Sequence, residues 1–144
     1  MSGLAGVLSL NRRLILASLV LTFCLQPYGQ ARAQSASQSV RLVIDYGDGV
    51  VKIFDHLPWS RGEMVIDALN AAHSSPHGIS FTYTGTGPNA FLTKIDDLRN
   101  EGAGSASKNW QYWVNTTYAD RSFAVYPIDA EDTVFWRFAT AVGK

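Results

Sequence analysis

The chain has 144 residues, of which 47% are hydrophobic and 17% are charged, and its formal net charge is zero. This composition excludes a mainly disordered chain and a coiled coil, and one domain is the expectation for this length. Because no long run of one charge occurs, nothing indicates a nucleic-acid-binding surface.

The N-terminal segment has the order of a secretory signal peptide. Arg12 and Arg13 precede an apolar run over residues 14–25, and the small-residue site Ala31-Arg32-Ala33 follows. The apolar run is shorter than the roughly 20 residues of a spanning helix. We therefore predict a signal peptide over residues 1–33 and a secreted or periplasmic protein; the alternative is an uncleaved N-terminal anchor. The single cysteine of the chain lies in this segment, so the mature protein forms no disulfide.

A polar leader and a β-hairpin are expected next. Residues 34–39 are small and polar, which predicts a flexible leader before a domain spanning 40–140. Apolar and polar residues then alternate over 40–46, the pattern of a strand with one apolar face. Gly47-Asp48-Gly49 favours a tight turn, and residues 50–54 form the expected return strand.

One helix is expected after the hairpin. Ser60 and Glu63 fit a capping box, in which each side chain bonds the backbone of the other residue. Apolar residues at helical spacing follow from Met64, and we expect the helix to end near His73, before Pro76.

The rest of the chain reads as strands and loops. Alternation predicts strands at 79–84, 91–95, 110–115 and 133–138, with a short extended piece at 124–126. A polar, glycine-rich stretch at 99–108 predicts a loop. A hairpin, one helix and several strands favour an α+β fold, with the helix packed on a mixed β-sheet in a β-grasp-like arrangement.

Several segments in this order resemble the transcobalamin-like C-terminal domain. They are residues 40–47, Glu63 to Leu69, 91–95, the W-x-Y-x-V-N segment from Trp110 to Asn115, and 128–136. This family occurs in bacterial secreted proteins as a domain of unknown function and is similar to the β-domain of vertebrate cobalamin carriers. The resemblance implies a β-grasp fold and binding of a small molecule such as cobalamin. The chain departs from the family where Thr116 replaces the usual glycine, and in the turn at 129–132.

Side-chain alternation assigns the strand residues to two faces of the sheet. The residues expected to face the helix are Val40, Leu42, Ile44, Val51, Ile53, Trp110, Tyr112, Val114, Val134, Trp136 and Phe138. Those expected to face away are Arg41, Val43, Asp45, Lys52, Phe54, Gln111, Trp113, Phe135 and Arg137.

The residues that face away include a candidate ligand-binding surface. It combines the aromatic residues Trp113, Phe135 and Phe54 with Arg137. Aromatic rings and arginine suit a flat ligand or a protein partner. The alternative is that the loops after Thr84 or Glu101 cover this face as a second small core.

No catalytic or metal-binding residues are predicted. His73 and His77 are four apart, but Pro76 interrupts the helix that would aim them at one metal. The Gly85-Thr86-Gly87 sequence has no following helix or P-loop lysine for a phosphate. The acidic pairs are expected to lie in turns: Asp96 with Asp97, and the trio Asp129, Glu131 and Asp132.

These observations predict a secreted, non-enzymatic domain that binds a small molecule, with cobalamin or another corrinoid as the first candidate and no other cofactor. The alternative is an extracytoplasmic protein-interaction or surface-assembly module with a protein partner and no small ligand. Neither hypothesis involves nucleic acid, or a membrane once the signal is cleaved.

Overall fold

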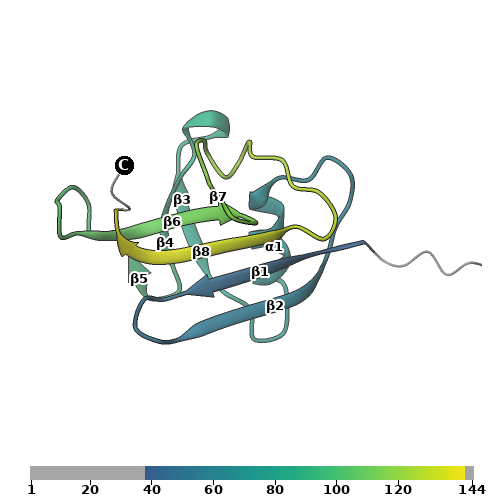
Figure 1. Cartoon of the computed structure of the whole chain (residues 1–144), viewed down its shortest axis with the longest axis horizontal. Coiled ribbons are helices and arrows are strands. Elements are labelled where there is room, and N and C mark those ends of the chain that lie inside the picture. Colours follow the sequence, from purple (N-terminus) through teal and green to yellow (C-terminus); the bar gives the residue numbers. More distant parts are fainter. Residues whose placement is uncertain (1–37, 142–144) are drawn as a thin grey trace, which may run out of the picture. The chain divides into compact units, whose positions relative to one another are not determined.

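The computed structural model describes residues 38–141 (Figure 1). The predicted signal peptide, residues 1–33, lies outside the described residues, as does most of the predicted leader. Among the described residues, no helix is long and apolar enough to cross a membrane.

A five-stranded sheet forms the main layer of the domain. Its strands are β1 (Ser39–Asp45), β2 (Val51–Pro58), β6 (Lys108–Val114), β7 (Thr117–Tyr118) and β8 (Thr133–Thr140). They lie in the order β2-β1-β8-β6-β7. The first and last strands, β1 and β8, are parallel neighbours at the centre, and the other pairs are antiparallel. The sheet is therefore mixed, as predicted.

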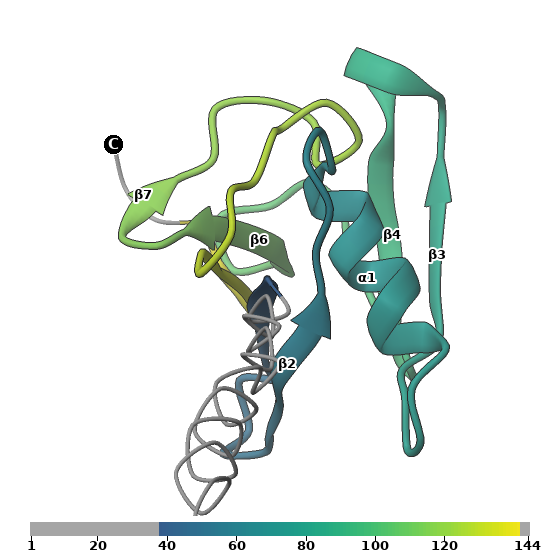
Figure 2. The same ribbon diagram turned by 90° about the vertical axis from the view of Figure 1, so that its right-hand side faces the viewer.

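One helix and a smaller sheet lie on the same side of the main sheet (Figure 2). The helix is α1 (Val65–His73), and the small sheet contains β3 (Phe81–Thr84), β4 (Phe91–Ile95) and β5 (Leu98–Arg99). A short 3-10 turn, η1 (Gly87–Asn89), joins β3 to β4. The prediction of an α+β domain with one helix on a mixed sheet is confirmed, but the separate three-stranded sheet was not foreseen.

The core lies between the main sheet and these elements. Alternate residues of β1, β6 and β8 point into it, because successive side chains of a strand point to opposite faces. They are Val40, Leu42 and Ile44; Trp110, Tyr112 and Val114; and Val134, Trp136 and Phe138. Val65, Ala68, Leu69 and Ala72 of α1 pack against them. For these three strands, the predicted helix-facing residues are confirmed.

The face assignment of β2 was wrong. Val51 and Ile53, expected to be buried, are 48% and 49% exposed, whereas Phe54 packs partly buried against the core. The reason is the register, since directly opposed residues share one face of a sheet. Asp45 pairs with Val51 and Leu42 pairs with Phe54, so Val51 lies on the side away from the helix.

The helix also begins later than predicted. Gly62 has a φ of +93°, which interrupts a helical path from Ser60. The backbone of Glu63 and Val65 instead bonds residues of the segment that precedes β8, at Ile128 and Tyr126. The first turn is closed by Asp67, whose carboxylate accepts from the Met64 amide at 2.8 Å. The predicted capping box between Ser60 and Glu63 is therefore wrong, while the end at His73 is confirmed.

Candidate functional site

An apolar row crosses the face of the main sheet that points away from α1, which we call the open face. The row consists of Ile53, Val43, Phe135, Trp113 and Tyr118, one residue from each strand, aligned by cross-strand pairing. Its ends are exposed, at 49% for Ile53 and 53% for Tyr118. In Figure 1 this face is turned toward the viewer, and no described element lies over it.

The aromatic half of the apolar row is closely spaced. The ring centroid of Trp113 lies 5.6 Å from that of Phe135 and 5.2 Å from that of Tyr118. Such spacing is typical of favourable aromatic pairs, so the three rings support one another at the surface. Together they form a continuous aromatic patch over β8, β6 and β7.

Two ion pairs flank the apolar row. The Nε of Arg137 lies 3.2 Å from Asp45 Oδ2, and the Nε of Arg41 lies 2.9 Å from Asp55 Oδ1. Both arginine side chains are about half exposed, so these pairs are expected to stabilise the fold only weakly. Their chemical effect is to border an apolar strip with charges of both signs.

Three of the four predicted surface residues lie together on the open face. Trp113 and Phe135 are direct cross-strand partners, and Arg137 is two residues further along β8. The assignment of Phe54 to this surface was wrong, because the register of β2 turns it to the helix side, opposite Leu42.

Tyr118 was not foreseen as a member of the row, because β7 contains only two residues. The sequence before β7 contains a weak signal for the turn that places Tyr118. Asn115 adopts a φ of +56°, a conformation that asparagine tolerates, and it begins the two-residue turn before β7.

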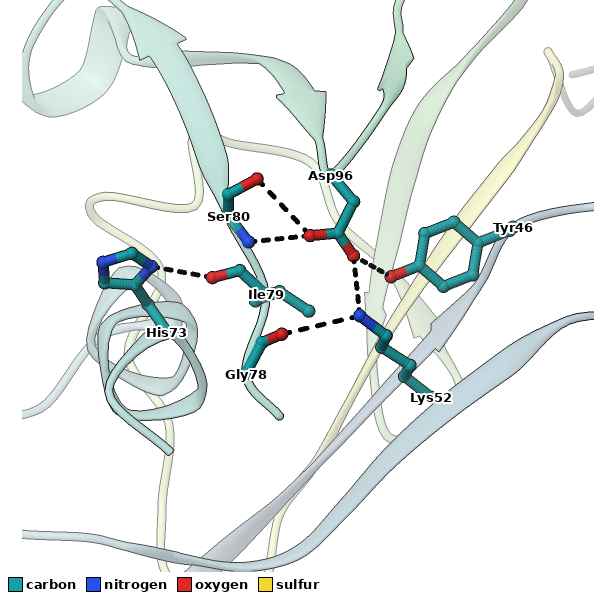
Figure 3. Close-up of polar contacts among 7 residues, drawn as sticks. All are labelled: Tyr46, Lys52, His73, Gly78, Ile79, Ser80 and Asp96. Atoms are coloured by element: carbon teal, nitrogen blue, oxygen red, sulfur yellow. Dashed lines mark hydrogen bonds and ion pairs between the residues drawn. The ribbon is translucent and has the colours of Figure 1, made fainter. Parts of the chain in front are cut away.

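A polar cluster on the other side of the molecule centres on Asp96 (Figure 3). Its Oδ2 accepts from Tyr46 Oη at 2.5 Å and from Lys52 Nζ at 2.9 Å. Its Oδ1 accepts from the Ser80 amide at 2.8 Å and from the Ser80 hydroxyl at 3.4 Å. Asp96 lies in the turn between β4 and β5, so one carboxylate ties the first hairpin to the small sheet.

The charge state of this cluster follows from its contacts. Burial by itself would raise the pKa of the Asp96 carboxyl, but the hydrogen bonds from Tyr46, Ser80 and Lys52, with the charge of Lys52, outweigh it and lower that pKa. Burial, together with the hydrogen bond to Asp96 and its negative charge, raises the pKa of Tyr46. An ionised carboxylate with its lone pairs engaged is a poor general base, so the cluster acts as a structural clamp.

The remaining candidates occupy structural positions. His73 Nδ1 lies 2.7 Å from the carbonyl oxygen of Ile79, which joins the end of α1 to the segment before β3. In the turn before β8, Asp132 accepts from the Asp129 amide and from Asn115 Nδ2. Within residues 38–141, no group of three or more His, Cys, Asp or Glu side chains could hold a metal ion.

Comparison with known families gives one match. A family model described as "Domain of unknown function (DUF4430)" matches residues 62–140, which is more than half of the chain. The matched region contains α1 and every strand from β3 to β8. No curated protein matches the chain.

Proposed function

Because the chain belongs to the DUF4430 family of domains of unknown function, we propose a function from its own geometry: it is a secreted or periplasmic, non-enzymatic domain that binds a ligand on the open face. The observation that carries this proposal is the apolar row. Three of its members, Val43, Phe135 and Trp113, come from strands in which the alternate side chains already build the core. The core of these strands is therefore formed without the row.

We further propose that the domain is a transcobalamin-like β-grasp domain. Its first and last strands pair in parallel at the centre of the sheet, and one helix crosses the covered face. The family match and the W-x-Y-x-V-N segment, which supplies Trp113, also support this assignment.

The first candidate ligand is cobalamin or another corrinoid. A corrin macrocycle is flat and apolar across its faces, with polar amide side chains around its rim. A strip with Phe135 and Trp113 at its centre suits the macrocycle, and Arg137 at its border suits the amides. Because tryptophan and arginine are frequent at binding hot spots, Trp113 and Arg137 are expected to contribute most of the binding energy.

Isothermal titration calorimetry of the purified protein with a set of corrinoids tests this proposal. We expect binding at micromolar affinity or tighter, and a loss of about tenfold or more in Trp113→Ala, which corresponds to roughly 1.4 kcal/mol. The matched control is Tyr83→Ala, because Tyr83 is an aromatic residue on β3 that is 44% exposed and lies outside the apolar row. Near-ultraviolet circular dichroism verifies that both variants are folded. No heat with any corrinoid, or equal losses in both variants, would contradict the proposal.

The second candidate function is a protein-interaction module that uses the same face. The observation that favours it is that the apolar row reaches the outer strand β2, where Val51 and Ile53 are both about half exposed. An exposed apolar edge strand is a ready template for pairing with another chain. Sedimentation velocity would then show self-association that Ile53→Lys abolishes, with no dependence on corrinoid.

A further inference from the structure

A hollow lies at the edge of β6, against the covered side of the main sheet. It has a volume of about 170 Å³ and lies between β4, β6 and the segment that follows β7. Aromatic residues dominate its wall: Trp110, Tyr112, Phe123 and Trp136. The small side chains of Ala90 and Ala119 leave space that larger side chains would fill. The other lining residues are Phe91, Leu92, Gln111, Tyr118, Arg121 and Ser122.

The size of this cavity corresponds to one small ring. An engineered apolar cavity of about 150 Å³ in another protein stays dry and binds benzene. The present cavity is slightly larger and opens to solvent, and half of its lining residues are aromatic, so a single six-membered ring fits its volume. Stacking and edge contacts with the wall would favour a planar ring over a branched aliphatic group of the same volume.

Most polar side chains of the wall already have partners within the protein. The Tyr112 hydroxyl donates to the Arg121 carbonyl at 2.7 Å, and the Ser122 hydroxyl donates to the Ala90 carbonyl at 2.8 Å. Trp110 Nε1 donates to the Leu98 carbonyl at 3.0 Å. A water needs two to four polar partners to be held well, so this wall favours an apolar occupant.

The exception in the wall is the indole nitrogen of Trp136. Trp136 is only 2% exposed, and its Nε1 is the one buried side-chain nitrogen or oxygen without a hydrogen bond among residues 38–141. The indoles of Trp59 and Trp110, in contrast, donate to backbone carbonyls at 2.9 and 3.0 Å. An unsatisfied buried donor costs stability, and an acceptor brought by a ligand would remove that cost.

We propose that this cavity binds a small neutral molecule with one planar ring and one acceptor atom, which accepts a hydrogen bond from the Nε1–H of Trp136. Because Nε1 is enclosed, the entering ring must shift a neighbouring side chain. The site differs from the centre of the open face, since Trp136 and Trp113 lie on adjacent strands but point to opposite sides of the sheet. Tyr118, at the end of the apolar row, also lines the cavity, so the Trp136 and Trp113 indole signals distinguish the two sites.

Two ring probes of nearly equal size test the proposal: pyridine, which carries one acceptor, and benzene, which carries none. Each is titrated into ¹⁵N-labelled protein in mildly alkaline buffer, where pyridine is uncharged. The four indole N–H signals are assigned by single Trp→Phe substitutions. We expect saturable binding in the millimolar range, with a downfield shift of the Trp136 indole proton by pyridine and no such shift by benzene. The Trp113 indole signal is the internal control.

Two cavity-filling variants, Ala119→Leu and Ala90→Leu, test the location. Each adds a side chain to the wall, and either is expected to abolish the pyridine shift while Trp113→Ala retains it. The proposal is overturned if neither probe perturbs the protein, or if benzene binds but pyridine leaves the Trp136 proton unmoved. It is also overturned if the shift persists in a folded cavity-filling variant. The spectrum of each variant reports its folding, and the wild-type titrations decide the question even if both variants unfold.

Discussion

The two faces of the main sheet are built from neighbouring residues of the same strands, yet one face is covered by other elements and the other is not. On β8, Trp136 is 2% exposed and packs in the core, while the preceding residue, Phe135, lies in the apolar row on the other side. The covered face is apolar because folding requires its burial. No described element lies over the open face, and its aromatic residues are the basis of the proposed binding site.

The largest difference in the free energy of unfolding is expected between two single substitutions at adjacent positions of β1. Ile44→Ala removes a fully buried side chain and is expected to lower the free energy of unfolding by about 2–5 kcal/mol. Val43→Ala removes an open-face side chain and is expected to cost about 1 kcal/mol or less. Urea denaturation of both variants measures the difference. Equal losses would mean that the open face is a second core, as the alternative interpretation of the sequence holds.

The sequence alone predicted the strands in which apolar and polar residues alternate regularly. Alternation located β1, β4 and β8 and assigned the faces of β1, β6 and β8, because each covered face is continuously apolar. It failed for β2, where Val51 and Ile53 resemble core residues and Lys52 does not. The register puts Lys52 on the covered side, where its partner is Asp96, 44 residues away in the sequence. A local pattern contains no information about such a partner.

Weakening the clamp at Asp96 should give the next largest change in the free energy of unfolding. In Asp96→Asn, the charge that pairs with Lys52 is lost and the hydrogen bonds from Tyr46 and Lys52 weaken. We expect a loss of about 1–2 kcal/mol in the free energy of unfolding. The adjacent Asp97→Asn is the matched control, because Asp97 is exposed, and it should leave stability unchanged. Similar losses in both variants would mean that the contacts of Asp96 contribute no specific stability to the covered side.

The same carboxylate should give the protein a defined response to acid. The pKa of Asp96 is lower in the folded state than its ordinary value of 3.8, so the folded state favours the ionised form. Its contribution is therefore complete above about pH 4 and is lost as the pH falls through the folded pKa. Denaturation midpoints measured from neutral to acidic pH should fall more steeply for the wild type than for Asp96→Asn. Parallel curves would contradict the assigned charge state.

The candidate site was predictable in part for the same physical reason as the fold. Trp113, Phe135 and Arg137 lie on strands whose register follows from a continuous core face, so alternation was enough to bring them together. Phe54 was misplaced because β2 lacks such a face: its apolar residues Val51 and Ile53 lie on the open side, and Phe54 lies opposite Leu42. Tyr118 and the Trp136 cavity depend on the path of the chain after Asn115, which turn residues without glycine indicate only weakly.

The smallest effect on stability is expected at the border of the apolar row. In Arg137→Gln, Asp45 loses its ion pair but still accepts a hydrogen bond from the Gly47 amide at 2.8 Å. The side chains at positions 45 and 137 both remain in contact with solvent. The free energy of unfolding should change by less than about 1 kcal/mol, as in the control Arg41→Gln. Under the proposed function, calorimetry should nevertheless show weaker corrinoid binding in Arg137→Gln. A loss of stability as large as that of Asp96→Asn would show that open-face charges support folding, and the distinction between the two faces would then fail.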